Sequence, residues 1–178
     1  MELEKRQRLE NNKISFRLGL LIISTMTILA LLGFVDKTAD MAVVTPRAIA
    51  NVIIFIAFLL SYFKFKGQPI FEVICMICVF VAYAILAISQ RNIYMYAAVF
   101  PSMLTVMIYM DKKLMRIGVA VAIAINVIAG VKNFIIYPAT QAQSLVQTVF
   151  AIVFCIAAYI VINTQSRHAG QSLDVIKD

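Results

Sequence analysis

The sequence has little of what catalysis requires. It holds a single histidine, His168, and only 9 acidic residues among 178. A histidine acting as a general base needs a carboxylate or amide beside it, but His168 lies between Arg167 and Ala169. There is no glycine-rich phosphate loop, and no serine or cysteine nucleophile has a base within its motif. A lone histidine, with carboxylates only in loops or at helix ends, also makes no metal site. We therefore expect no enzyme, no catalytic or metal-ligating residue and no cofactor.

Charged residues are scarce as well, at 14% against 62% hydrophobic residues. Soluble domains carry about a quarter charged residues, so this balance indicates lipid as the solvent. The three cysteines, Cys75, Cys78 and Cys155, fall within apolar stretches. The first two have neither the second cysteine pair nor the histidine of a zinc site, so we expect all three to be packing residues.

Six long apolar stretches predict transmembrane helices, because a spanning helix needs about 20 mostly apolar residues. They are Leu18–Val35, Ala48–Phe63, Val73–Gln90, Asn92–Met110, Ile117–Val131 and Leu145–Thr164. The expected fold class is all-α, a polytopic membrane protein of six transmembrane helices with both termini cytoplasmic. Residues 1–17 would form a cytoplasmic tail, residues 18–164 the transmembrane domain, and residues 165–178 the start of a cytoplasmic helix or coiled coil.

The ends of the second stretch follow from its flanking residues. Arg47 and Lys64 bound it, and we expect their long side chains to carry their charges to the lipid headgroups. Pro46 stands directly before it, as is typical of a helix start.

The first and fifth stretches also need an argument about their ends. The first is too long for a cleaved signal peptide and lacks a small-residue cleavage site, so we expect an uncleaved anchor. The fifth is short, but the apolar run resumes at Phe134–Tyr137. We therefore expect one helix as far as Tyr137, with Lys132 at an interface.

The positions of lysine and arginine predict the orientation, because cytoplasmic loops carry an excess of both. Twelve lie on one side of the predicted membrane: Lys5, Arg6, Arg8, Lys13, Arg17, Lys64, Lys66, Lys112, Lys113, Arg116, Arg167 and Lys177. Four lie on the other: Lys37, Arg47, Arg91 and Lys132. We expect a multi-pass protein of the bacterial cytoplasmic (inner) membrane. Its net charge of +7 suits anionic membrane lipid, and no nucleic-acid partner is expected.

The end of the sequence has the spacing of a coiled-coil helix, with small or apolar residues every three or four positions. These signal-exit positions are Ile162, Ser166, Ala169, Leu173 and Ile176. We expect this helix to pair with a second copy, which would make the protein a homodimer.

Asn126 is the deepest polar residue of the fifth stretch, ~14 Å from its start. It belongs to a stripe of small residues spaced by four, with Gly118, Ala122 and Gly130. Such a stripe allows another helix to approach closely, so Asn126 should face the bundle. A hydrogen bond to a neighbouring helix and a contact with a ligand are both open to it.

Pro101 lies ~12 Å into the fourth stretch and should kink that helix. Kinked helices often line cavities, because a freed carbonyl must be satisfied by protein or water. A cavity for an unknown small molecule is therefore expected in the outer half of the bundle. Its candidate lining residues are Asn51, Tyr94, Tyr96, Pro101, Asn126 and Gln147.

Several segments together resemble the membrane region of a known family. They are the charged segment Met1–Asn12, the Tyr-x-Tyr-x-x-x-Phe-Pro run from Tyr94 to Pro101, Tyr109-x-Asp111, Asn126-Val127-Ile128, and Gln171–Val175. The segments are similar to the N-terminal six-helix region of methyl-accepting chemotaxis proteins of Gram-positive anaerobes, which lack an extracellular sensor domain. The resemblance implies a membrane-embedded sensory input module that passes a signal through its last helix to a cytoplasmic coiled coil. It also implies truncation before the signalling hairpin, which bears the methylation sites and binds the adaptor and kinase.

A second interpretation comes from another class of membrane protein. Substrate-binding subunits of vitamin transporters of the energy-coupling-factor type also have six helices in a chain of similar length. Their first helix normally carries an Ala-x-x-x-Ala face that docks the transport subunit. Leu18–Val35 contains one alanine, Ala30, which favours the receptor.

Overall fold

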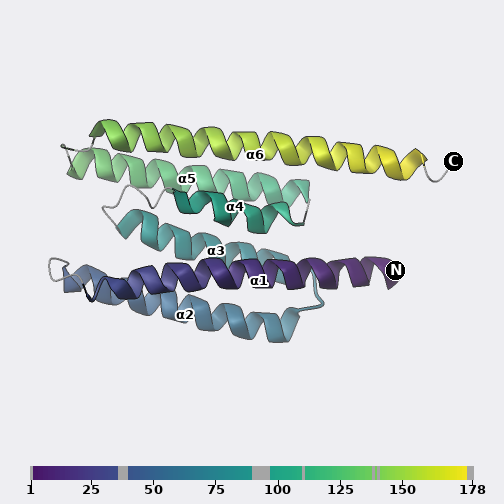
Figure 1. Ribbon diagram of the computed structural model, residues 1–178, viewed down its shortest axis with the longest axis horizontal. Coiled ribbons are helices and arrows are strands. Elements are labelled where there is room, and N and C mark those ends of the chain that lie inside the picture. Colours follow the sequence, from purple (N-terminus) through teal and green to yellow (C-terminus); the bar gives the residue numbers. More distant parts are fainter. Residues whose placement is uncertain are drawn as a thin grey trace.

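The computed structural model describes residues 2–35, 40–89, 97–109, 111–137, 139 and 141–175, with side chains from residue 5 to residue 165. The regular elements in this part of the chain are all helices. They are α1 (Glu2–Leu32), α2 (Met41–Phe65), α3 (Ile70–Ser89), α4 (Val99–Met107), α5 (Lys112–Ile136) and α6 (Gln141–Val175). They lie along one common direction (Figure 1). For the described residues, the all-α prediction is confirmed.

Five of these helices are long and apolar enough to cross a membrane. They supply the candidate spans Lys5–Leu32, Met41–Phe65, Ile70–Ser89, Lys112–Ile136 and Gln141–Gln165. The fifth predicted stretch is one helix, as expected, and ends at Ile136. At its start Asp111 acts as the N-cap, since its Oδ1 accepts hydrogen bonds from the backbone N–H groups of Lys113 (2.7 Å) and Leu114 (2.9 Å).

The fourth predicted stretch, Asn92–Met110, is described only over residues 97–109. Its described helix, α4, has 9 residues, a length of ~14 Å, which is about half of the hydrocarbon core. Pro101 is the third residue of α4. The first four N–H groups of a helix have no partner within it, so this proline breaks no helical bond. Within α4, Pro101 therefore causes no kink of the kind we expected.

α1 begins well before the predicted first span, so residues from Glu2 onward are helical. Its early turns anchor the connection between α2 and α3. The Nδ2 of buried Asn12 donates to the carbonyl oxygens of Lys66 (2.9 Å) and Gln68 (3.2 Å). Arg8 Nε lies 3.8 Å from Oε1 of Glu72 in the first turn of α3.

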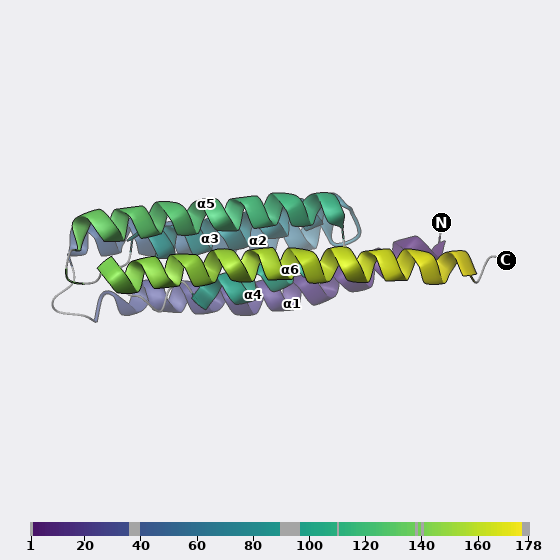
Figure 2. The same ribbon diagram turned by 90° about the horizontal axis from the view of Figure 1, so that it is seen from above.

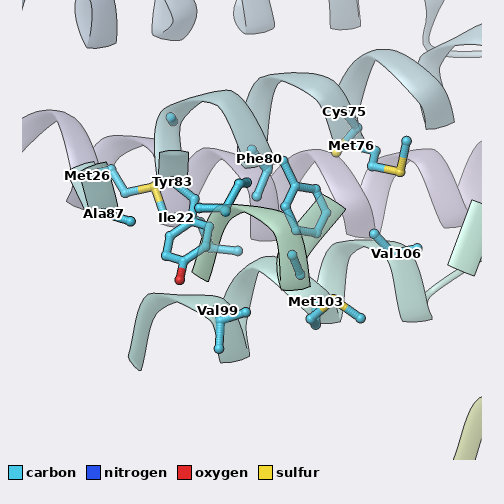
Figure 3. Packing of buried hydrophobic residues seen from close by; sticks show 14 of the residues in the cluster. Ile22, Met26, Cys75, Met76, Phe80, Tyr83, Ala87, Val99, Met103 and Val106 are labelled. Atoms are coloured by element: carbon cyan, nitrogen blue, oxygen red, sulfur yellow. The ribbon is translucent and has the colours of Figure 1, made fainter. Parts of the chain in front are cut away.

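The helices pack around a central one, α3. α3 is central, because it packs against α1, α2, α4 and α5. Figure 3 shows α3 side chains such as Phe80 and Tyr83 between Ile22 of α1 and Met103 of α4, all of them buried. α6 lies at the edge, against α5 and α4. Cys75 and Cys155 are buried and all three cysteines are free, as expected of packing residues.

Both outer helices project from the same end of the bundle. The start of α1 and the end of α6 extend beyond α2, α3 and α5 on one side (Figures 1 and 2). The connections from α2 to α3 and from α4 to α5 lie at that same end (Figure 1). Of the lysines and arginines whose side chains are described, those in the first half of α1, at the end of α2 and at the start of α5 belong to this end.

Candidate functional site

A buried polar contact joins α3 to α5 at the depth predicted for Asn126. The hydroxyl of Tyr83 donates to Asn126 Oδ1 at 2.8 Å, and Asn126 Nδ2 donates to the carbonyl of Ala122 at 2.7 Å. Tyr83 and Asn126 are both fully buried. The interhelical hydrogen bond, one of the two roles open to Asn126, is therefore present.

The small-residue stripe around Asn126 does bring helices together. A Cβ at Gly118 would lie 3.2 Å from Val106 of α4, tighter than ordinary van der Waals contact. A Cβ at Gly130 would collide with Thr148 of α6. α5 thus touches three helices along one face: α4 at Gly118, α3 at Asn126 and α6 at Gly130.

The other predicted cavity residues do not gather around Asn126. Asn51 is fully buried on α2, where its Nδ2 donates to the carbonyl of Arg47 at 3.0 Å and its Oδ1 has no partner. Pro101 is half-buried in the first turn of α4, and Gln147 is half-buried on α6 with its Oε1 unpartnered. α2 packs against α1 and α3, whereas α6 packs against α4 and α5, so Asn51 and Gln147 lie on opposite flanks. Tyr94 and Tyr96 lie outside the described residues.

The structure contains a cavity elsewhere, between α2, α3 and α5, with a volume of about 850 Å³. None of the six predicted residues lines it. Its floor runs along α3 from Met76 to Ser89, a length of ~20 Å. α2 and α5 form the two walls, since both pack on α3. The floor residues Ile77 and Val81 are exposed, so the cavity is a groove that opens on the outside of the bundle. We call it the α3 groove.

The lining of the α3 groove is apolar except at two residues, Arg47 and Ser89. Ser89 already donates its hydroxyl hydrogen to the carbonyl of Ile85 within α3. Arg47 is therefore the charged group of the lining, and it lies toward the end of the groove farther from the two chain termini.

Arg47 packs into the bundle, whereas we expected its side chain to extend along α2 toward the lipid headgroups. α2 begins at Met41, where Asp40 Oδ1 accepts from the N–H of Ala42 at 2.9 Å, so Pro46 and Arg47 lie inside the helix. The side chain of Arg47 is buried, with 9% exposure. Its Nε has no hydrogen-bond partner, and the described residues offer its guanidinium no carboxylate.

The guanidinium lies against the end of α1. A Cβ at Gly33, directly after the last residue of α1, would collide with Arg47 Nη2. The carboxyl end of a helix carries a partial negative charge, which stabilises a nearby cation without neutralising it. Among the described residues, Arg47 is thus a buried cation beside a helix dipole and without a carboxylate partner.

The signal-exit positions fall partly within the described side chains. Ile162 is buried in the core of the bundle. The backbone at Ser166, Ala169 and Leu173 continues the same helix, while Ile176 lies outside the described residues.

Comparison with known proteins identified no relative, since no family model, no curated protein and no solved structure matches the chain. The described part of the chain defines the class: it is all-helical, with five helices long and apolar enough to cross a membrane.

Proposed function

We propose that this chain is the sensory input module of a chemotaxis-type receptor, in which α6 carries the signal out of the membrane to a cytoplasmic coiled coil. The observation that carries the proposal is the continuity of α6. It is one helix of 35 residues, or ~53 Å. Its neighbour α5 has 25 residues, so about ten residues of α6, or ~15 Å, project beyond it (Figure 2).

The buried face of α6 supports this role. Ser144, Ala151, Cys155, Ala158 and Ile162 are its buried residues. At 100° per residue, Ser166, Ala169 and Leu173 lie within about 40° of the same line on the helix. The face that packs on α5 and α4 in the bundle is therefore continued by the predicted seam.

This continuity gives α6 a way to transmit a change. α5 begins at Lys112, so α6 projects beyond its partner in the bundle. A shift, tilt or rotation of α6 against α5 would change the face that the projecting segment presents. A coiled-coil receiver responds to that face, because its seam is a narrow stripe. We propose that a second copy supplies the other half of the seam.

The proposal includes six membrane-crossing segments, with α4 and the residues before it forming the fourth, in the bacterial cytoplasmic membrane. The distribution of charge supports cytoplasmic termini. Among the described side chains, ten lysines and arginines belong to the end from which α1 and α6 project, and two, Arg47 and Lys132, to the other.

The experiment is a test of helical phase. Residues 1–178 are fused to the signalling hairpin of a chemotaxis receptor, and alanines are inserted after Gln165. One alanine rotates the downstream helix by ~100°, whereas seven return it to within ~20° of its starting phase. We expect kinase output to change sharply with one inserted residue and to recover with seven.

The matched control is a single alanine inserted after Lys5, in the exposed first turns of α1. It should leave output unchanged at an equal membrane level of the fusion. Output that is the same for one and for seven residues after Gln165 would refute the signalling role and leave the transporter subunit as the better interpretation.

A further inference from the structure

We propose that the α3 groove binds a long-chain fatty acid, with the carboxylate on Arg47 and the acyl chain along α3. This inference is independent of the proposed signalling role, because it rests on the groove and not on α6.

The buried charge of Arg47 indicates that the ligand is an anion. An unpaired cation buried in an apolar part of a membrane protein is costly, and such residues commonly mark a ligand or partner. Arg47 meets this description: its Nε is buried without a partner, and it belongs to the lining of the groove. The end of α1 beside Gly33 supplies a dipole, and none of the described residues places a carboxylate on Arg47.

The length and the apolar lining of the α3 groove fit an acyl chain. Its apolar floor is ~20 Å long. One leaflet of the hydrocarbon core is about 15 Å thick, which is the reach of one lipid chain. The groove opens along exposed Ile77 and Val81, so a chain can enter sideways from the bilayer.

The lining also distinguishes a carboxylate from a phospholipid headgroup. A planar guanidinium can satisfy both oxygens of one carboxylate through two parallel hydrogen bonds. A phosphoglycerol headgroup carries more polar oxygens than the groove can serve, because Ser89 already bonds to Ile85 and the other lining residues are apolar. The position of Arg47, ~10 Å along α2 from its Asp40 cap, would also draw a bulky headgroup below the interface.

The test uses the full chain purified in detergent, with radiolabelled palmitic acid as the probe and unlabelled 1-hexadecanol and phosphatidylglycerol as competitors. Wild-type protein should bind palmitate saturably, near one molecule per chain. Arg47→Gln removes the charge and keeps most of the side-chain length. We expect it to weaken palmitate binding about ten- to a hundredfold, the range for loss of a charged hydrogen-bonding partner. Hexadecanol should compete poorly with wild type.

Two further variants test whether palmitate binds in the α3 groove or whether its binding depends only on folding or on surface charge. Ala84→Phe narrows the groove while leaving Arg47 in place, and it should lower palmitate binding even if Arg47→Gln were to disturb folding. Lys66→Gln removes an exposed cation outside the groove and should bind as wild type.

The proposal is wrong if Arg47→Gln binds palmitate as wild type does, or if Ala84→Phe has no effect. It is equally wrong if wild type binds no palmitate saturably, or if phosphatidylglycerol displaces palmitate at equal concentration. Because all of these readouts are binding measurements, their failure leaves the phase experiment on α6 unaffected.

Discussion

The hydrogen bond between Tyr83 and Asn126 gives a measurable contribution to the packing of α3 on α5. Both side chains are fully buried and their oxygens lie 2.8 Å apart. Interhelical hydrogen bonds in membrane proteins contribute about 0.6 kcal/mol on average and up to about 1.7 kcal/mol. We expect Asn126→Leu to lower the free energy of unfolding by ~0.6–2 kcal/mol, because it removes the acceptor from Tyr83 while keeping the branched shape of the side chain.

A double-mutant cycle isolates the contact itself. Tyr83→Phe, Asn126→Leu and the double variant are unfolded in mixed detergent micelles, with loss of helical circular dichroism as the readout. The coupling free energy between the two positions should be ~0.6–1.7 kcal/mol. The control is Asn163→Leu, the same substitution on an exposed part of α6, which should be close to neutral.

Two results would refute this reasoning. Additive single substitutions, with a coupling free energy near zero, would mean that the bond adds nothing to the packing of α3 on α5. An Asn126→Leu variant of unchanged stability that loses its response to a stimulus would instead assign Asn126 to ligand contact.

Two other predictions concern topology and close packing. In a variant without native cysteines, a cysteine at Ala142 should react with an impermeant thiol reagent in whole cells and one at Gln68 should not; labelling of the second before lysis would contradict cytoplasmic termini. Gly130→Ala should lower the free energy of unfolding by ~1–3 kcal/mol, because its Cβ meets Thr148, and Thr148→Ala should restore part of the loss. Gly67→Ala, whose Cβ meets no atom within 4 Å, is the neutral control, and a Gly130 variant as stable as wild type would contradict the close approach of α5 and α6.

The sequence predicts the ends of a helix well where a capping polar side chain stands directly beside the apolar run. α5 is one example: Asp111 starts it, and the apolar pattern continues through Lys132 to its last turn. α2 is the opposite case, because Pro46 and Arg47 look like a helix boundary in the sequence. Asp40 caps the helix two turns earlier, and Arg47 becomes buried against the end of α1.

Of the two residues in the buried polar contact, only Asn126 could be predicted from the sequence. Asn126 was identifiable by its depth and by its stripe of glycine and alanine, whereas its partner Tyr83 lies in an apolar run with no local signal. The α3 groove was not predictable from local patterns. It exists because α2 and α5 both pack on α3, and the order of helices around a central one is a property of the whole bundle.

A cysteine scan along the projecting part of α6 tests most directly whether its buried stripe continues as a seam between two copies. Single cysteines are placed at residues 166–173 in the variant without native cysteines, and membranes are oxidised mildly. A disulfide needs Cβ atoms about 3.5–4.5 Å apart, so it reports which face meets the partner. We predict strong cross-linking between copies at Ser166, Ala169 and Leu173 and weak cross-linking at Gln171, on the opposite face. Cross-linking strongest at Gln171, or without any helical period, would contradict a seam that continues the buried face of α6.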